Sequence, residues 1–291
     1  MGSLHYFSTL KSSQKRMETL GKLLTHLILI CGAIVVMIPF AWMLSTALKR
    51  PSEIFRFPPQ WIPSKPQWHN FVIALTAYPF GNFLKNTLII TTLSTVGTVL
   101  SCSMAGFAFA RLRWPGRDLF FLILLTTMML PTQVTLVPEF ILFRWLGWVN
   151  THCPLFIPAW FARQPFYVFL MRQFFMTIPL ELDDAAKIDG ASYLTLFTKI
   201  LLPMAKPAVG IVAILFFQFK WDEFFGPLIY LHDQRLFTLA LGLRAFQGGQ
   251  YGSDWNLMMA ASLVFMIPLL GTFYFAQKRF VQGIVVTGIK G

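Results

Sequence analysis

Four of the chain's twelve acidic residues lie within nine consecutive positions. On a helical wheel, Leu182, Ala185 and Ala186 share one arc, whereas the acids and Lys187 occupy the opposite side. Carboxylates in a first turn also complement the positive end of the helix dipole. The pattern predicts a short amphipathic helix, which on these residues alone is a surface connection that is acidic to stay solvated. Its acids are Glu181, Asp183, Asp184 and Asp189, in the stretch ELDDAAKIDGASYLTLFTKILLPMAKP of residues 181–207.

A turn and a second helix are expected directly after the acidic helix. Gly190 is placed to end the first helix, and Ser192 can cap the next one. The second helix leads back toward apolar sequence, so residues 172–206 are predicted to form a helix-turn-helix elbow. Its apolar residues are Leu194, Phe197, Ile200 and Leu201, followed by Pro203 and Pro207.

Known catalytic and metal-binding patterns are missing from the sequence. It contains no G-x-x-x-x-G-K-[ST], no H-E-x-x-H and no G-x-S-x-G. None of the cysteines forms a C-x-x-C pair and the histidines are widely scattered. We therefore expect no catalytic residue, no metal and no cofactor on this chain. The residues considered are Cys31, Cys102, Cys153, His5, His26, His69, His152 and His232.

The composition is that of a membrane protein. Hydrophobic residues make up 56% of the 291 residues and charged residues 12%, about half the charged fraction of a soluble domain. Six apolar stretches are each close to the roughly 20 residues that a membrane-spanning helix needs. These stretches are 23–48, 86–110, 119–143, 153–171, 207–231 and 256–277.

Lysine and arginine predict the orientation, because short loops rich in them stay in the cytoplasm. With the N-terminus inside, fourteen of these residues fall on the cytoplasmic side and eight outside. Segment 1–22, the elbow and tail 278–291 are then cytoplasmic. The net charge of +12 is explained by this asymmetry and by anionic lipid, so we expect a lipid partner and no nucleic acid.

Polar residues inside the predicted spans could line a solute path. Gln218 and Asp222 lie one helical turn apart with Trp221 beside them, and amides, carboxylates and an aromatic face suit a carbohydrate. Alternatively, Lys220 and the neighbouring acids neutralise each other where helices meet. Arg163 in the fourth span and Glu139 in the third are expected to pair with each other or to lie near the membrane edge. Pro131 and Pro138 are expected to kink the third span.

The elbow resembles the EAA loop of ABC-importer permeases, whose core reads E-A-A, three residues, G, and later I-x-L-P. Aspartate stands here in place of the glutamate, which keeps the charge and shortens the side chain by one methylene. Three other segments are similar to the carbohydrate-uptake, maltose-transporter-like branch: FARLRWPGRD at 109–118, KWDEFFGPLIY at 220–230 and VVTGIKG at 285–291. The elbow matches are Asp184, Ala185, Ala186, Gly190, Ile200, Leu202 and Pro203, with IDGAS at 188–192.

This resemblance implies an all-α integral membrane protein with six transmembrane helices and the type I ABC importer permease fold, both termini being cytoplasmic. It implies a permease domain at 23–277 in the inner membrane of a prokaryote, which takes part in the import of a carbohydrate. The implied partners are a second homologous permease, two ATPase subunits that hold ATP and Mg, and a solute-binding protein. The residues expected to couple to the ATPase are Glu181, Asp184, Ala185, Ala186, Asp189 and Gly190.

The same resemblance implies that the tail reaches the interface between the ATPase subunits through Gly288, Lys290 and Gly291. The alternative is an end without a partner. Two rival functions remain: a secondary transporter, with Asp222 and Glu223 as ion-coupling sites, and a membrane-embedded enzyme. No internal repeats favour the first, and the missing motifs disfavour the second.

Overall fold

Three long helices set the frame of the protein in a computed structural model that describes residues 2–248 and 254–288. They are α1 (Gly2–Ala47), α4 (Phe80–Arg111) and α15 (Trp255–Gly288). Each contains a segment long and apolar enough to cross a membrane. Across the described residues, all regular structure is helical, which agrees with the all-α class.

Two further apolar segments are sharply bent. One runs from α5 (Arg117–Thr126) and η1 (Thr127–Met129) into α6 (Thr132–Trp145) with an angle of 102°. The bend falls at Pro131, whose ring fixes φ near −59° and removes a backbone donor, as the kink prediction requires. The other bend, of 77°, joins Tyr193–Met204 to α12 (Lys206–Trp221). Counting each bent pair as one span gives up to five spans among the described residues.

The fourth predicted span is broken rather than continuous. It consists of α7 (Cys153–Phe156), η2 (Ile157–Phe161) and α8 (Pro165–Thr177), with a left-handed residue, Ala162, between the last two. Breaking a helix frees backbone carbonyls, which need donors inside a membrane. Helix α4 supplies two: Ser94 Oγ donates to the Leu155 carbonyl (3.2 Å) and Ser101 Oγ to the Ala159 carbonyl (3.0 Å).

Helix α4 approaches α8 closely at Gly106. A Cβ on this residue would lie 2.7 Å from the Met171 Cβ and 2.9 Å from the Arg172 backbone nitrogen. The absence of a side chain is therefore what lets these two backbones come together.

We expect Gly106→Ala to destabilise the protein by about 1–3 kcal/mol, because the added methyl overpacks a contact that includes backbone. The matched control is Gly81→Ala in the same helix, where a Cβ meets nothing within 4 Å. Thermal unfolding of the two purified variants measures the difference. Equal unfolding midpoints would show that Gly106 does not set the α4–α8 spacing.

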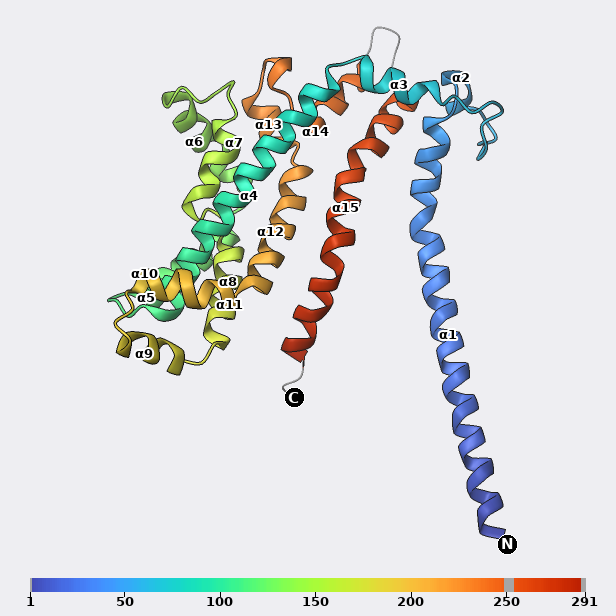
Figure 1. Ribbon diagram of the computed structural model, residues 1–291. Helices are drawn as coiled ribbons and strands as arrows, with labels where there is room; N and C mark the ends of the chain where they lie inside the picture. Colours follow the sequence, from blue (N-terminus) through green and yellow to red (C-terminus); the bar gives the residue numbers. More distant parts are fainter. Residues whose placement is uncertain (1, 249–253, 289–291) are drawn as a thin grey trace.

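Short elements close the two ends of the molecule (Figure 1). Helix α9 (Glu181–Ile188) and the elbow lie at one end, together with the lower ends of α1 and α15. Helix α3 (His69–Thr76) lies at the opposite end, near the top of α15. The other elements are α2 (Pro51–Ile54), α10 (Tyr193–Thr195), η3 (Leu196–Leu201), α11 (Leu202–Met204), α13 (Phe225–Tyr230), η4 (Gln234–Leu236), α14 (Leu239–Leu243) and η5 (Arg244–Gln247).

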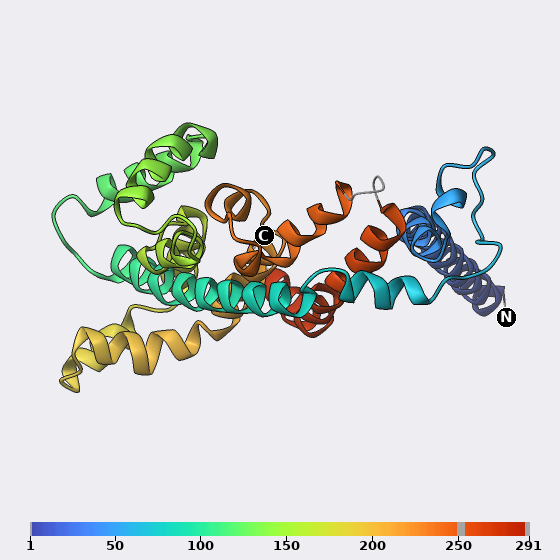
Figure 2. The same ribbon diagram turned by 90° about the horizontal axis from the view of Figure 1, so that it is seen from above.

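Helices α1 and α15 are longer than the membrane spans predicted for them, which are 23–48 and 256–277. Figures 1 and 2 show α1 standing apart from the other helices along most of its length, and none of its apolar window is buried within the chain. Helix α15 continues to Gly288, beyond the predicted end of the span at Gln277. The tail up to Gly288 is therefore helical, whereas Lys290 and Gly291 lie outside the described residues.

Candidate functional site

The elbow turns at Gly190, as the sequence predicts. Gly190 has a φ of +77°, a left-handed conformation that glycine adopts without steric cost. Its N–H donates to the Lys187 carbonyl (3.0 Å), and the Ala191 N–H donates to the Ala186 carbonyl (2.9 Å). This pair of bonds is the Schellman ending of a helix. A side chain at Gly190 would meet nothing within 4 Å, so only the backbone requires glycine.

The second limb of the elbow begins at Ser192. The Ser192 side chain accepts a hydrogen bond from the Thr195 N–H (3.2 Å), which confirms the predicted cap. After one turn of α-helix, residues 196–201 form a π-helix, and the Leu202 N–H donates to the Phe197 carbonyl five residues earlier. Such segments are rare and frequent at functional sites.

The inner face of α9 is held by one charged pair. Asp183 Oδ2 lies 3.7 Å from Arg111 Nη1 at the end of α4, and both side chains are at least 93% buried. Arg111 Nη2 also donates to the carbonyls of Phe175 (2.7 Å) and Ile178 (2.6 Å). Burial raises the pKa of the Asp183 carboxyl, and the positive charge of Arg111 opposes that shift. Arg111 therefore ties α4, the end of α8 and the elbow together.

This geometry corrects the helical-wheel prediction. Asp183 and Ala186 face the core, whereas Leu182 and Ala185 are exposed. The orientation differs because buried Arg111 takes an acid as its partner, so the helix turns a carboxylate inward and leaves a leucine outside. Arg111 was not among the expected functional residues, and the wheel placed Asp183 on the polar, outward side of the helix. The one available signal was an arginine at the end of a span, since buried cations need a partner.

The outer face of the elbow combines charged and apolar side chains. Of the six expected coupling residues, five are exposed, and Ala186 is the exception at 5% exposure. Lys187 pairs with Asp184 at 3.2 Å on this surface. Large apolar side chains are also exposed on the elbow: Leu180, Leu182, Ile188, Tyr193 and Leu194.

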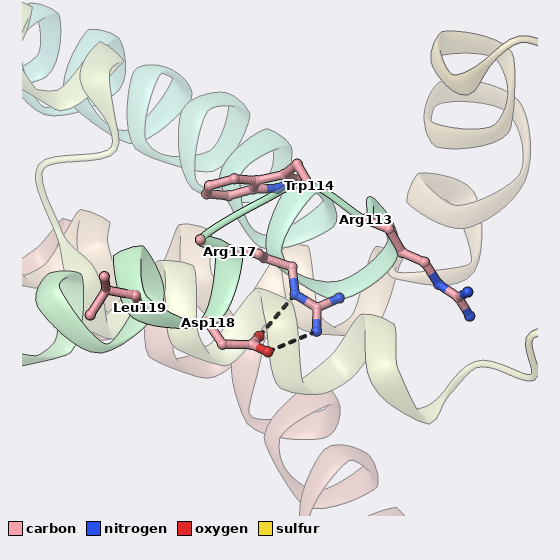
Figure 3. A pocket seen from close by; sticks show the side chains of 6 residues that line it. Arg113, Trp114, Arg117, Asp118 and Leu119 are labelled. Atoms are coloured by element: carbon pink, nitrogen blue, oxygen red, sulfur yellow. Dashed lines mark hydrogen bonds and ion pairs between the residues drawn. The ribbon is translucent and has the colours of Figure 1, made fainter.

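The 109–118 motif forms a loop at the end of α4, where Arg111 holds the elbow. A pocket of about 350 Å³ lies in this loop. Figure 3 shows its lining side chains, of which Arg117 binds both carboxylate oxygens of Asp118 and Arg113 points away from that pair. The Phe109 ring packs on Trp114 and on Phe121, with centroids 5.8 and 5.3 Å apart. The Arg117–Asp118 ion pair and the aromatic contacts of Phe109 therefore hold the loop in place.

Trp221 does not present its ring to a path in this structure. It is 1% exposed and stacks between Phe217 (5.6 Å) and Phe265 (5.7 Å). Its Nε1 donates to the Phe265 carbonyl at 3.3 Å. The indole therefore joins α12 to α15 as a packing residue.

The other polar residues in and directly after α12 differ in whether they form an ion pair. Lys220 forms an ion pair with Glu223, as the neutralisation alternative predicted. Asp222, at the end of α12, is exposed and has no ion pair within the part of the chain that the structure describes. Gln218 is half-buried, and its carbonyl accepts the Asp222 N–H (3.3 Å).

Arg163 and Glu139 form the predicted pair. Arg163 Nη2 donates to both carboxylate oxygens of Glu139, at 2.8 and 2.7 Å. Among residues 2–248 and 254–288, no group of three or more His, Cys, Asp or Glu side chains is placed to hold a metal ion.

Comparisons with known proteins place the chain in a family. The family model described as "Binding-protein-dependent transport system inner membrane component" matches residues 97–286. The probable ABC transporter permease protein YurM of Bacillus subtilis is 32% identical over 284 residues, covering 97% of this chain and 93% of that protein. The trehalose/maltose transport system permease protein MalG of Thermococcus litoralis is 33% identical over 95% of this chain and 99% of that protein.

The fold agrees with this match. A chain in the crystal structure of a bacterial ABC transporter that imports the acidic polysaccharide alginate superposes with a TM-score of 0.78 at 21% identity, covering 90% of this chain and 97% of that one. The resemblance to ABC-importer permeases is confirmed. The chain belongs to the family of binding-protein-dependent transport system inner membrane components.

Proposed function

We propose that this chain is one permease subunit of an ATP-driven importer for a carbohydrate, in the inner membrane of a prokaryote. The observation that carries the proposal is near full-length similarity to a trehalose/maltose permease, together with the match to the family. A second homologous permease completes the path, two ATPase subunits bind ATP and Mg, and a solute-binding protein delivers the sugar. Six spans and cytoplasmic termini complete this proposal.

The elbow is the proposed contact with the ATPase. Its support is an elbow that exposes acids and large apolar side chains together, since a solvated surface connection has no need for residues such as Ile188, which is 85% exposed. The Arg111–Asp183 pair holds this face to the spans. Closure of the ATPase dimer would then move the elbow as a rigid lever and switch the path between inward and outward opening.

Two finer assignments belong to the same proposal. Gln218 and Asp222 face the path, and the support is that Asp222 is exposed in a span without an ion pair among the described residues. The tail, with Gly288, Lys290 and Gly291, contacts the ATPase subunits. In support of that contact, α15 carries the chain to Gly288 at the elbow's end of the molecule (Figure 1).

We expect Asp222→Ala to lower sugar uptake with normal membrane levels, because an exposed carboxylate that binds hydroxyls is lost while the fold is kept. Asp222→Asn, which keeps the shape and the hydrogen-bonding oxygen, should retain more uptake. Trp221→Ala should instead lower the amount of folded protein, since truncating a buried tryptophan costs about 3–5 kcal/mol. Uptake assays and immunoblots separate the two effects. Wild-type uptake by Asp222→Ala would remove Asp222 from the path.

Reconstitution tests the proposed function. The chain is purified with its sister permease, the ATPase subunits and the binding protein, and ATP hydrolysis is measured in vesicles with maltose, trehalose, glycerol 3-phosphate and an amino acid as probes. We expect a carbohydrate or polyol derivative to stimulate hydrolysis. Full transport by the chain alone would favour a secondary transporter, and stimulation by the amino acid alone would overturn the substrate class.

A further inference from the structure

A groove lies where α4 meets the junction between the elbow and α12. It has a volume of about 210 Å³, and it follows the 77° bend between Tyr193–Met204 and Lys206–Trp221. Its walls come from three parts of the chain that are distant in sequence. The lining residues are Val99, Leu100 and Ser103 of α4, Phe197 and Thr198 of η3, Leu202 and Pro203 of α11, and Lys206 and Val209 of α12.

The groove is apolar apart from three side chains. Thr198 satisfies its hydroxyl within its own helix by donating to the Leu194 carbonyl (2.7 Å). Ser103 is 1% exposed, and its Oγ has no hydrogen-bond partner in the described part of the chain. Lys206 is exposed at the first residue of α12. No acidic residue lines the groove.

The unpartnered Ser103 hydroxyl points to a missing ligand, because a buried hydroxyl without a partner costs about 1–3 kcal/mol. Other hydroxyls of α4, such as that of Thr98, are also buried and unpartnered, but Ser103 is the one that lines this groove. Ser103 lies eight residues before Arg111, about 12 Å along α4. The groove therefore lies about two turns of α4 away from the arginine that holds the elbow.

We propose that this groove binds an anionic phospholipid of the cytoplasmic leaflet. One acyl chain covers the apolar wall, an ester carbonyl accepts the Ser103 hydroxyl, and the phosphate pairs with Lys206. Charge complementarity selects this occupant, since the groove carries one cation and no acid and the cytoplasmic leaflet is rich in anionic lipid. A lipid seated here also contacts both limbs of the bend, and so supports the junction through which the elbow connects to α12.

The test measures lipid retained by the purified complex. The complex is equilibrated in nanodiscs of POPC with increasing POPG, and native mass spectrometry counts the POPG molecules retained. Loss of one lysine–phosphate contact should weaken POPG retention at this site about fivefold, so Lys206→Gln should need about five times more POPG to retain the last lipid per copy of this chain. The control is Lys199→Gln, an exposed lysine of η3 that does not line the groove. It should retain the wild-type number.

A second variant examines the acyl chain. Leu100→Trp enlarges a half-exposed side chain at the groove wall and should displace POPG and POPC alike from this site. Four outcomes overturn the proposal: unchanged retention in Lys206→Gln, equal loss in Lys199→Gln, displacement of the lipid by inorganic phosphate, and failure of Leu100→Trp to join its sister permease. The last two outcomes would make the occupant a free anion or the sister chain. None of these measurements depends on which solute is transported.

Discussion

Gly190→Val is expected to uncouple ATP hydrolysis from transport while the permease still inserts and assembles. The φ of +77° at this position costs an ordinary residue about 1–2 kcal/mol, and more for a branched side chain. The Schellman bonds from the turn back to the end of α9 would be lost if the turn relaxed, so α9 would change its angle to the spans. Because a Cβ would meet nothing here, the effect is one of backbone conformation alone.

The control for this prediction is Gly190→Asn, since asparagine tolerates the left-handed conformation. Uptake and solute-stimulated ATP hydrolysis are measured in vesicles containing each variant. A cost of about 1.4 kcal/mol in the turn shifts the equilibrium between the correct elbow and a relaxed turn tenfold. Coupling should therefore fall by up to about tenfold in the valine variant and much less in the asparagine variant. Normal uptake by Gly190→Val would show that the turn is not the coupling joint.

Arg111→Met is expected to have the largest effect on stability. It leaves the Asp183 carboxylate buried without its partner and removes the donor to two carbonyls of the α8 end. Breaking a buried ion pair from one side costs about 3–5 kcal/mol. Asp183→Asn should cost less, because Arg111 keeps its two carbonyl acceptors. The double variant Arg111→Met, Asp183→Asn should cost less than the sum of the two single substitutions, because no unpaired charge is then buried.

Thermal unfolding of the assembled complex and its ATP hydrolysis measure these variants as a double-mutant cycle. The control is Lys187→Gln, which breaks the exposed pair with Asp184 on the same helix and should change stability by less than about 1 kcal/mol. If the two single substitutions at the buried pair prove additive, Arg111 and Asp183 do not act as one joint.

Local features of the elbow could be predicted from the sequence, because short-range rules govern them. A glycine after an amphipathic helix and a serine before the next one correctly predicted a left-handed turn and a cap. The kink at Pro131 follows equally from the proline ring. In each case the residue and the conformation it determines are within a few positions of each other.

The inward turn of Asp183 could not be predicted in this way. Its partner Arg111 belongs to another helix, and the wheel of α9 alone favours Leu182 as the buried residue. Trp221 is a similar case: an aromatic ring beside polar residues suits a sugar site, but the ring is enclosed by α15, far along the chain. The break in the fourth span also depends on distant hydroxyls of α4 that satisfy the freed carbonyls.

Cross-linking from the elbow to the ATPase tests the central claim most directly. A photoreactive benzoylphenylalanine replaces Ile188 on the outer face of the elbow, and in a second variant Trp145 at the end of α6, which is 83% exposed. Both variants are irradiated in native membranes with and without ATP, and the products are identified by mass spectrometry. The account predicts that the ATPase subunit is captured at position 188, with a yield that changes with ATP, and is not captured at position 145. Capture of the ATPase at neither position, or equally at both, would contradict it.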